Sequence, residues 1–216
     1  LREARLQASI DHEAICEVYE TGHDRGHPYL AMQFLEGRPL GDFVELLSVD
    51  AKLVIIQKVA MALHQAHAMG MVHRDIKPGN IMHNPEAGMV KVADFGIARI
   101  VDDSKTKTGD ILGSPIYMSP EQLKGSKVTG ATDIYSLGVT FYQLLTADVP
   151  FNGDSIANLA YQILNKKYKS VREVRPGLPA SAARIVNKAM QKDPAKRFPS
   201  GGAMAEALRK SLGRDF

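Results

Sequence analysis

The sequence predicts an α+β fold, in which a short strand-bearing N-terminal part precedes a larger and mostly helical body. Two observations lead to this prediction. Strand-like runs, ICEVYE at 15–20 and YLAMQF at 29–34, flank the turn-rich stretch GHDRGHP at 22–28 and indicate a hairpin. From about Ala51 onward, apolar residues instead recur at the spacing of buried helices.

The body is expected to begin with a long helix that ends at Gly70. Its apolar residues fall on one face, at Leu53, Ile56, Ala60, Leu63 and Ala66. Two short strands should follow at 81–83 and 90–93, joined by the turn signal NPEAG. A helix at 133–146 is apolar nearly all round, which is typical of a helix inside a core. Residues 1–9 resemble the end of a helix, and three further helices are expected near 155–166, 180–191 and 200–212.

Composition excludes several classes of function. The 216 residues contain 27 Lys and Arg against 24 Asp and Glu, and the net charge of +3 is too small to indicate nucleic-acid binding. No apolar run approaches membrane-spanning length and no signal peptide is present. We therefore expect a cytoplasmic location and no membrane contact from this segment, so that any membrane anchor of the full-length protein would lie outside it. A single cysteine, Cys16, allows no intrachain disulfide and suits a reducing compartment.

The stretch HRDIKPGN, residues 73–80, combines groups that suit phosphoryl transfer. Asp75 can accept a proton, Lys77 is a cation for a transferring phosphoryl group, and Asn80 offers a hard oxygen ligand for Mg²⁺. A second acid, Asp94, follows a strand-like run in VADFG. Phosphoryl transfer asks a protein mainly to position groups and neutralise charge, and this set of residues fits that task better than hydrolysis.

These motifs resemble those of the eukaryotic-like (Hanks-type) serine/threonine protein kinases, over essentially the whole chain. The phrases HRDIKPGNIM, KVADFGIAR, YMSPEQ, TDIYSLGVTFYQLLT and DPAKRF are most similar to the bacterial, PknB-like branch. The resemblance implies a protein-kinase-like fold, with residues 1–35 as the remnant of an N-lobe and hinge and residues 36–216 as a C-lobe. It also implies ATP and Mg²⁺ as cofactors, and protein substrates that present Ser or Thr hydroxyls.

The resemblance assigns a role to each polar residue of the catalytic loop at 73–80. It implies that Asp75 orients the substrate hydroxyl and takes its proton, and that Lys77 stabilises the γ-phosphate. Asn80 and Asp94 would hold Mg²⁺.

Other residues would bind the adenine. The hinge would be Gln33, Phe34 and Leu35, whose backbone meets the base, with Met32 as the gatekeeper before it and Met82 as the floor of the pocket. The alternative is that both methionines are ordinary core residues. We favour a place in the pocket because of their sequence positions relative to the hinge and to the catalytic loop.

A further group would support the site. The resemblance places His73 and Phe95 in a stacked hydrophobic spine and pairs Glu121 with Arg197 as a buried ion pair. Asp133 would accept hydrogen bonds from the backbone of the His-Arg-Asp turn, because an unpaired acid at the head of an apolar helix would be costly.

The activation segment is expected to span 94–121. Ser114 occupies the position where these kinases usually place Thr beside the catalytic Asp, which together with the catalytic-loop Lys favours Ser/Thr substrates. Thr106 and Thr108 lie in a polar stretch, and a phosphate there would give Arg74 a charge-assisted partner. The alternative is that these threonines only solvate the loop.

Two parts of the family's site have no match here: a Gly-rich turn over the ATP phosphates and a Lys on the third strand. No GxGxxG occurs, and Glu3 matches the helix Glu that pairs with that Lys. We therefore expect that the sequence begins inside this helix, and that the 216-residue polypeptide alone binds ATP weakly and phosphorylates poorly.

Two alternatives compete with a protein kinase. A non-catalytic pseudokinase or binding module would lack the Gly-rich loop and the strand Lys, but such proteins usually lose some of the catalytic-loop residues retained here. A small-molecule kinase of the aminoglycoside phosphotransferase type shares an acid–Asn loop. It typically lacks both the HRDxKP motif and an activation segment closed by a Glu–Arg pair.

Overall fold

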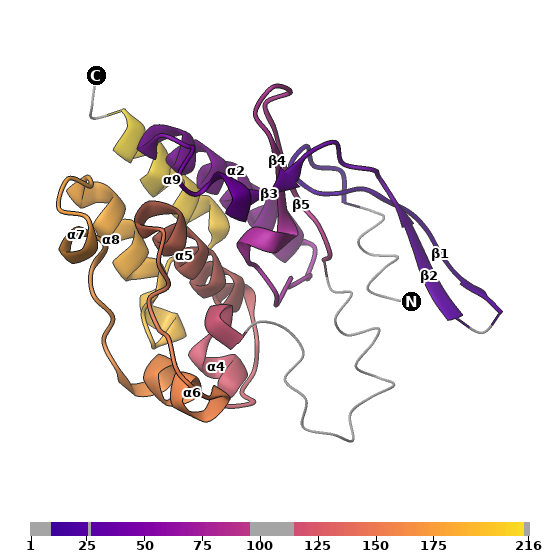
Figure 1. Ribbon diagram of the computed structural model, residues 1–216. Coiled ribbons are helices and arrows are strands. Elements are labelled where there is room, and N and C mark those ends of the chain that lie inside the picture. The colour runs from indigo at the N-terminus through magenta and orange to yellow at the C-terminus, as the bar shows by residue number, and fades with distance from the viewer. Residues whose placement is uncertain (1–9, 26, 96–114, 214–216) are drawn as a thin grey trace.

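The computed structural model describes residues 10–25, 27–95 and 115–213. Its strands form two separate sheets. β1 (Val18–Asp24) and β2 (His27–Met32) make an antiparallel hairpin. β3 (Arg38–Pro39), β4 (Ile81–Asn84) and β5 (Met89–Val92) make a three-stranded antiparallel sheet in that order. Figure 1 shows the hairpin projecting to one side of the helices.

Helices are the commonest secondary structure of the described chain, in keeping with the predicted α+β class. They are α2 (Val49–Ala68), α4 (Pro120–Leu123), α5 (Gly130–Thr146), α6 (Ile156–Asn165), α7 (Val171–Val174), α8 (Ala180–Ala189) and α9 (Gly201–Leu212). Short 3₁₀ turns lie at Leu40–Phe43, Pro78–Asn80, Pro115–Tyr117 and Pro194–Lys196. None of the helices in the described ranges is long and apolar enough to cross a membrane.

Helix α5 is the centre of the core. It packs against α2 on one side and α8 on another, and nearly all of its residues are buried. Its predicted all-round apolar character is therefore confirmed. The helix begins three residues earlier than the pattern predicted, at Gly130, because Thr129 caps its N-terminus in a reciprocal capping box with Thr132.

The predicted turn over 22–28 is wrong in extent, because strand pairing continues as far as Asp24 and His27. The predicted strand over 15–20 is also divided between two sheets. Ile15 forms a parallel bridge with Val92 of β5, and the Cys16 N–H donates to the Val92 carbonyl at 2.9 Å. The alternation of apolar residues in this run could not show that it pairs first with β5 and then with β2, because the same alternating pattern suits pairing with either strand.

Glu121 in α4 and Arg197, which follows the turn at Pro194–Lys196, form a buried ion pair. The guanidinium donates from Nη1 to Oε1 at 2.7 Å and from Nη2 to Oε2 at 2.8 Å, and Thr132 Oγ1 donates to Oε1 at 2.9 Å. Burial raises the pKa of Glu121, but hydrogen bonds from Arg197, from the Glu121 backbone and from Thr132, together with the Arg197 charge, outweigh burial and hold the pKa below its ordinary value. The bidentate pair thus fastens α4 to the helical body.

Gly201 allows α9 to approach α2 closely. A Cβ atom at this position would overlap the carbonyl oxygen of Ala60 and lie 2.9 Å from the backbone nitrogen of His64. Both neighbours are backbone atoms of a long helix, so no change of side-chain rotamer relieves the overlap.

Gly201→Ala should lower the free energy of unfolding by about 2–3 kcal/mol, because α9 must move away from α2 to admit the methyl group. Gly177→Ala is the matched control, since a Cβ there meets no atom within 4 Å. Urea denaturation of the two variants checks the difference. Equal stability of both variants would contradict the close approach.

Glu121→Ala should destabilise the protein by about 3–5 kcal/mol, because it leaves the Arg197 guanidinium buried without its carboxylate. Glu206→Ala removes an exposed carboxylate that pairs with Arg209 at 2.8 Å, and it should leave the urea midpoint nearly unchanged.

The stability gap between wild type and Glu121→Ala should also depend on pH. A carboxylate with a lowered pKa stabilises the fold above its unfolded-state pKa, and this contribution is lost as the pH falls through the folded-state pKa. The gap should therefore be complete at neutral pH and shrink in acid below the ordinary value of 4.5. A stability gap that stays constant down to pH 2 would contradict the claim that the ionised Glu121 carboxylate stabilises the fold through Arg197.

Candidate active site

Three polar side chains of residues 73–80 meet at one carboxylate oxygen. Oδ2 of Asp75 accepts from Lys77 Nζ at 2.6 Å and from Asn80 Nδ2 at 3.0 Å. The side chains of Asp75 and Lys77 are 31% and 24% exposed, so the group is open to solvent on one side. Among the described residues, no donor reaches Oδ1 of Asp75, and this oxygen can accept a proton from an incoming group.

Asn80 is held with a fixed amide orientation. Its Nδ2 also donates to the backbone oxygen of Asp75 at 2.8 Å, so within the described part of the chain both hydrogen bonds of its side chain are made by the nitrogen. The side-chain oxygen of Asn80 is then left as a neutral, hard acceptor. The 3₁₀ turn at Pro78–Asn80 brings the amide back over Asp75, because Pro78 presets the backbone of its first residue.

His73 connects the loop to the strand that precedes Asp94. Its Nδ1 accepts from the Asp75 N–H at 3.2 Å, and its Nε2 lies 2.8 Å from the Ala93 carbonyl oxygen. A backbone N–H can only donate and a carbonyl can only accept, so the imidazole is neutral with its proton on Nε2. The His73 ring also meets Phe95 edge-on, with centroids 4.6 Å apart, so the two predicted spine residues are in contact.

A backbone hydrogen bond of Ala93, the residue before Asp94, joins this part of the chain to the catalytic loop. The Ala93 N–H donates to the Asn80 carbonyl at 2.9 Å, and Asp94 itself is exposed with φ of 62°. Arg74 also has positive φ, at 70°. Left-handed backbone at two residues that are not glycine is strained, and such strain persists only where the surroundings enforce it.

Asp133 enforces the turn at Arg74. Its fully buried carboxylate accepts the N–H of His73 at 2.8 Å and that of Arg74 at 2.7 Å, in the arrangement predicted from the sequence. A third hydrogen bond, from His67 Nε2 at 2.7 Å, was not predicted. Since His67 and Asp133 lie 66 positions apart, no local pattern could have linked them.

A glycine signal does accompany His67. A Cβ on Gly130, the first residue of α5, would lie 2.6 Å from Nδ1 of the His67 ring. The glycine leaves room for the imidazole against the start of α5, where it reaches Asp133. The glycine just before the predicted apolar helix could have suggested that another segment packs closely there. It could not have shown that this segment carries His67 or that His67 binds Asp133.

The two methionines expected around the adenine come from different sheets, and Gln33 and Leu35 lie outside both sheets. Met32 ends β2, and the Gln33 N–H donates to the Glu17 carbonyl at 2.8 Å. The Oε1 of Gln33 is buried and makes no hydrogen bond within the described part of the chain. Leu35 is half-buried, and Met82 is half-buried in β4, opposite Lys91 of β5. Burial raises the pKa of the neighbouring Cys16 thiol, whose Sγ donates to the backbone carbonyl oxygen of Gln33 at 3.6 Å.

Several expected site residues lie outside the described residues: Glu3, Thr106, Thr108, Ser114 and most of the segment 94–121. Where the description resumes, α4 is tied to the catalytic loop. Gln122 Nε2 donates to the Arg74 carbonyl at 2.8 Å.

The donor set suits Mg²⁺ shared with phosphate groups. Within residues 10–25, 27–95 and 115–213, no group of three or more His, Cys, Asp and Glu side chains could hold a metal ion by itself. Asn80 and Asp94 could each offer one hard oxygen ligand to such an ion. Proteins usually bind Mg²⁺ with one or two carboxylates and leave the remaining positions to substrate phosphates and water.

Comparison with known proteins gives a consistent result. The sequence matches the family described as "Protein kinase domain" over residues 1–211. It is 40% identical to the serine/threonine-protein kinase PksC of Streptomyces coelicolor, over 96% of this chain and 40% of that protein. It is 35% identical to the serine/threonine-protein kinase PrkC of Bacillus subtilis, over 99% of this chain and 34% of that protein. The chain thus spans well under half the length of these two relatives.

Solved structures show the same fold. The PknI kinase domain of Mycobacterium tuberculosis matches with a TM-score of 0.78 and 27% identity, over 97% of this chain and 77% of that one. Rad53 residues 1–466, in complex with AMP-PNP, matches with a TM-score of 0.80 and 26% identity, over 94% of this chain and 52% of that one. With its family match over nearly the whole length, the chain belongs to the protein kinase domain family.

Proposed function

We propose that the protein transfers the γ-phosphoryl group of ATP to serine and threonine hydroxyls of proteins, with residues 73–80 as its catalytic loop. The observation that carries this proposal is the convergence of Lys77 and Asn80 on Oδ2 of Asp75. Kinase relatives of 35–40% identity support the same reaction class. A division into an N-lobe remnant and hinge at 1–35 and a C-lobe at 36–216 is part of the proposal.

Asp75 acts as the base. With Oδ2 engaged by Lys77 and Asn80, Oδ1 faces the incoming hydroxyl, orients it and takes its proton as the phosphoryl group transfers. The two hydrogen bonds prevent the carboxylate from rotating, so the accepting oxygen stays in position.

Lys77 and Asn80 serve the phosphate side of the reaction. The Lys77 ammonium neutralises charge on the γ-phosphate, while the Asn80 oxygen and the Asp94 carboxylate hold Mg²⁺. When bound, Mg²⁺ supplies charge neutralisation at the phosphate oxygens. The backbone of Gln33 to Leu35 receives the adenine between Met32 and Met82.

Regulation would act through the segment 94–121. A phosphate on Thr106 or Thr108 would pair with the Arg74 guanidinium and order the segment beside the catalytic base. Ser114 would contact the same base and favour Ser/Thr substrates.

Asp75→Asn, made in the natural full-length protein, should lower kcat by about 10²–10⁴-fold, because an amide cannot take the substrate proton. The KM for ATP should change little, since the amide keeps the size of the carboxylate. Steady-state phosphorylation of a generic protein substrate measures both constants.

Asp154→Asn is the control for this measurement, because Asp154 is exposed and, among the described residues, its side chain hydrogen-bonds only to Asn158. It should keep wild-type kcat. An Asp75→Asn enzyme with wild-type kcat would overturn the proposed role of the base.

A further inference from the structure

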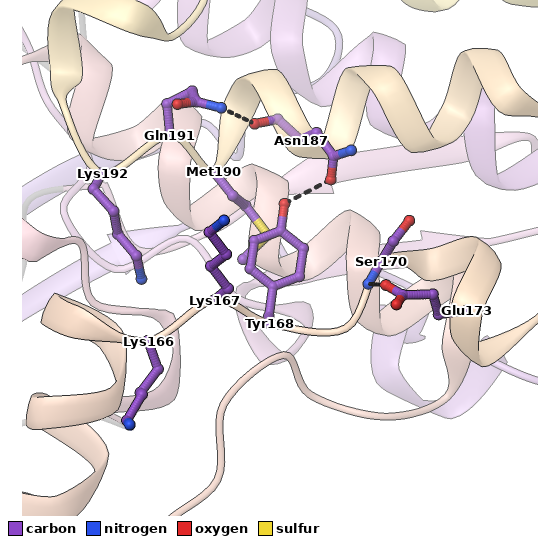
Figure 2. Close-up of a pocket in the computed structure, with 9 residues that line it drawn as sticks. All are labelled: Lys166, Lys167, Tyr168, Ser170, Glu173, Asn187, Met190, Gln191 and Lys192. Carbon is purple, nitrogen blue, oxygen red and sulfur yellow. Dashed lines mark hydrogen bonds between the residues drawn. The ribbon is translucent and has the colours of Figure 1, made fainter.

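A second polar site lies in the helical body, formed by residues that are not part of the proposed catalytic machinery. A pocket of about 430 Å³ opens between the segment after α6 and the C-terminal end of α8 (Figure 2). One wall consists of Lys166, Lys167, Tyr168, Ser170 and Glu173, and the other of Asn187, Met190, Gln191 and Lys192. The site requires an explanation of its own, because the proposed phosphoryl transfer makes no use of these side chains.

The lining is strongly positive. It contains three lysines against one acid, a net excess of two positive charges. The single carboxylate is already engaged, because Glu173 accepts the Ser170 N–H at 2.5 Å in the capping box of α7. Lys166 and Lys167 are exposed at the rim, and the Lys166 Nζ lies 5.8 Å from the centroid of the Tyr161 ring. The pocket therefore offers unneutralised ammonium groups to a ligand.

Lys192 is fixed in the wall rather than free in solvent. Its Nζ donates to the Ile163 carbonyl near the end of α6 and lies 4.1 Å from the centroid of the Phe151 ring. Burial, followed by repulsion from Arg197, lowers the pKa of Lys192 to about 8. An ammonium has three donors, so two remain for a ligand, and an anion would offset the repulsion from the guanidinium.

The wall behind Lys192 is rigid before any ligand arrives. Arg197 donates from Nε to the Gln191 carbonyl at 2.8 Å and from Nη2 to the Lys192 carbonyl at 3.2 Å, while it holds the Glu121 carboxylate. The two backbone carbonyls next to the pocket are thus fastened to a buried ion pair. A site built on fixed backbone loses little conformational entropy on binding.

The opposite wall is also held in place. The Tyr168 hydroxyl donates to Asn187 Oδ1 at 2.9 Å, and Figure 2 shows this bond spanning the two walls. The Tyr168 ring is packed edge-on against Tyr142 and Phe151, with centroids 5.6 and 5.8 Å away. Nδ2 of Asn187 makes no hydrogen bond within the described residues and is available to a peptide carbonyl.

We propose that this pocket binds a phosphorylated peptide segment, with the phosphate monoester between Lys166, Lys167 and Lys192. A phosphoryl group on serine or threonine carries close to two negative charges, which matches the net charge of the lining. The size of the pocket and its mixed lining, with Met190 and Tyr168 beside the Asn187 amide, suit a peptide around that group better than a free ion.

The test compares fluorescent heptapeptide libraries of degenerate sequence, with either phosphoserine or serine at the centre, by anisotropy. The phosphoserine library should bind wild type about tenfold tighter or more, because hydrogen bonds to ionised groups are strong. The variant Lys166→Gln/Lys167→Gln should lose about tenfold of that affinity. Both lysines are exposed, and circular dichroism verifies that the variant is folded.

A matched control removes the same charge from another basic cluster. Lys188→Gln/Lys210→Gln alters the groove between α8 and α9, where Lys188 lies over Phe198 and Lys210 pairs with Glu206. This variant should bind the phosphoserine library within about twofold of wild type.

Three results would overturn the proposal. The first is equal affinity of wild type for the two libraries. The second is an equal loss of affinity for the phosphoserine library in both double variants, which would mean that any lysines on the surface attract the phosphate equally well. The third is competition by inorganic phosphate at the same concentration as the phosphopeptide, which would mean that the pocket takes a free ion and not a peptide.

Discussion

A single buried carboxylate, that of Asp133, organises the catalytic loop. It lies in the first turn of the central helix α5 and has no access to water, so its charge must be balanced by hydrogen-bond donors from the protein. His73 and Arg74 supply backbone N–H groups and His67 supplies a ring N–H. The left-handed turn at Arg74 is stable because these bonds outweigh its strain, and that turn presents Asp75 to the site.

The same turn of α5 also holds α4, which contacts the catalytic loop. Thr132, the residue before Asp133, donates its hydroxyl to Glu121, and the neighbouring Gln122 donates to the Arg74 carbonyl. These contacts close a ring that runs from the catalytic loop through Asp133 and Thr132 into α4 and back to the loop. Such a network is rigid only when every member is satisfied, so its parts should fail together rather than singly.

Much of this could be predicted from the sequence, because the relevant signals are local. Asp75, Lys77 and Asn80 lie within six positions, so one tight loop with Pro78 brings them together. Helix α5 was recognisable from its apolar residues, since a helix that is apolar all round has no stable place on a surface. The pairing of Glu121 with Arg197 was predicted by resemblance to a family and not from spacing.

Other features could not be predicted, because they depend on which distant segments meet. The bond from His67 to Asp133 and the overlap that Gly201 avoids both arise where α2 meets another helix. A single sequence records each partner separately and gives no sign of their contact. The division of the predicted strand at 15–20 between two sheets has the same origin, since its side-chain pattern fits either partner.

Amide hydrogen exchange at His73 and Arg74, followed by NMR, tests the central role of Asp133 most directly. If the buried carboxylate holds both N–H groups, these two loop amides should exchange as slowly as the core amides of α5, through global unfolding. Exchange as fast as that of exposed loop amides, while α5 remains protected, would show that Asp133 does not hold the turn and would contradict this account.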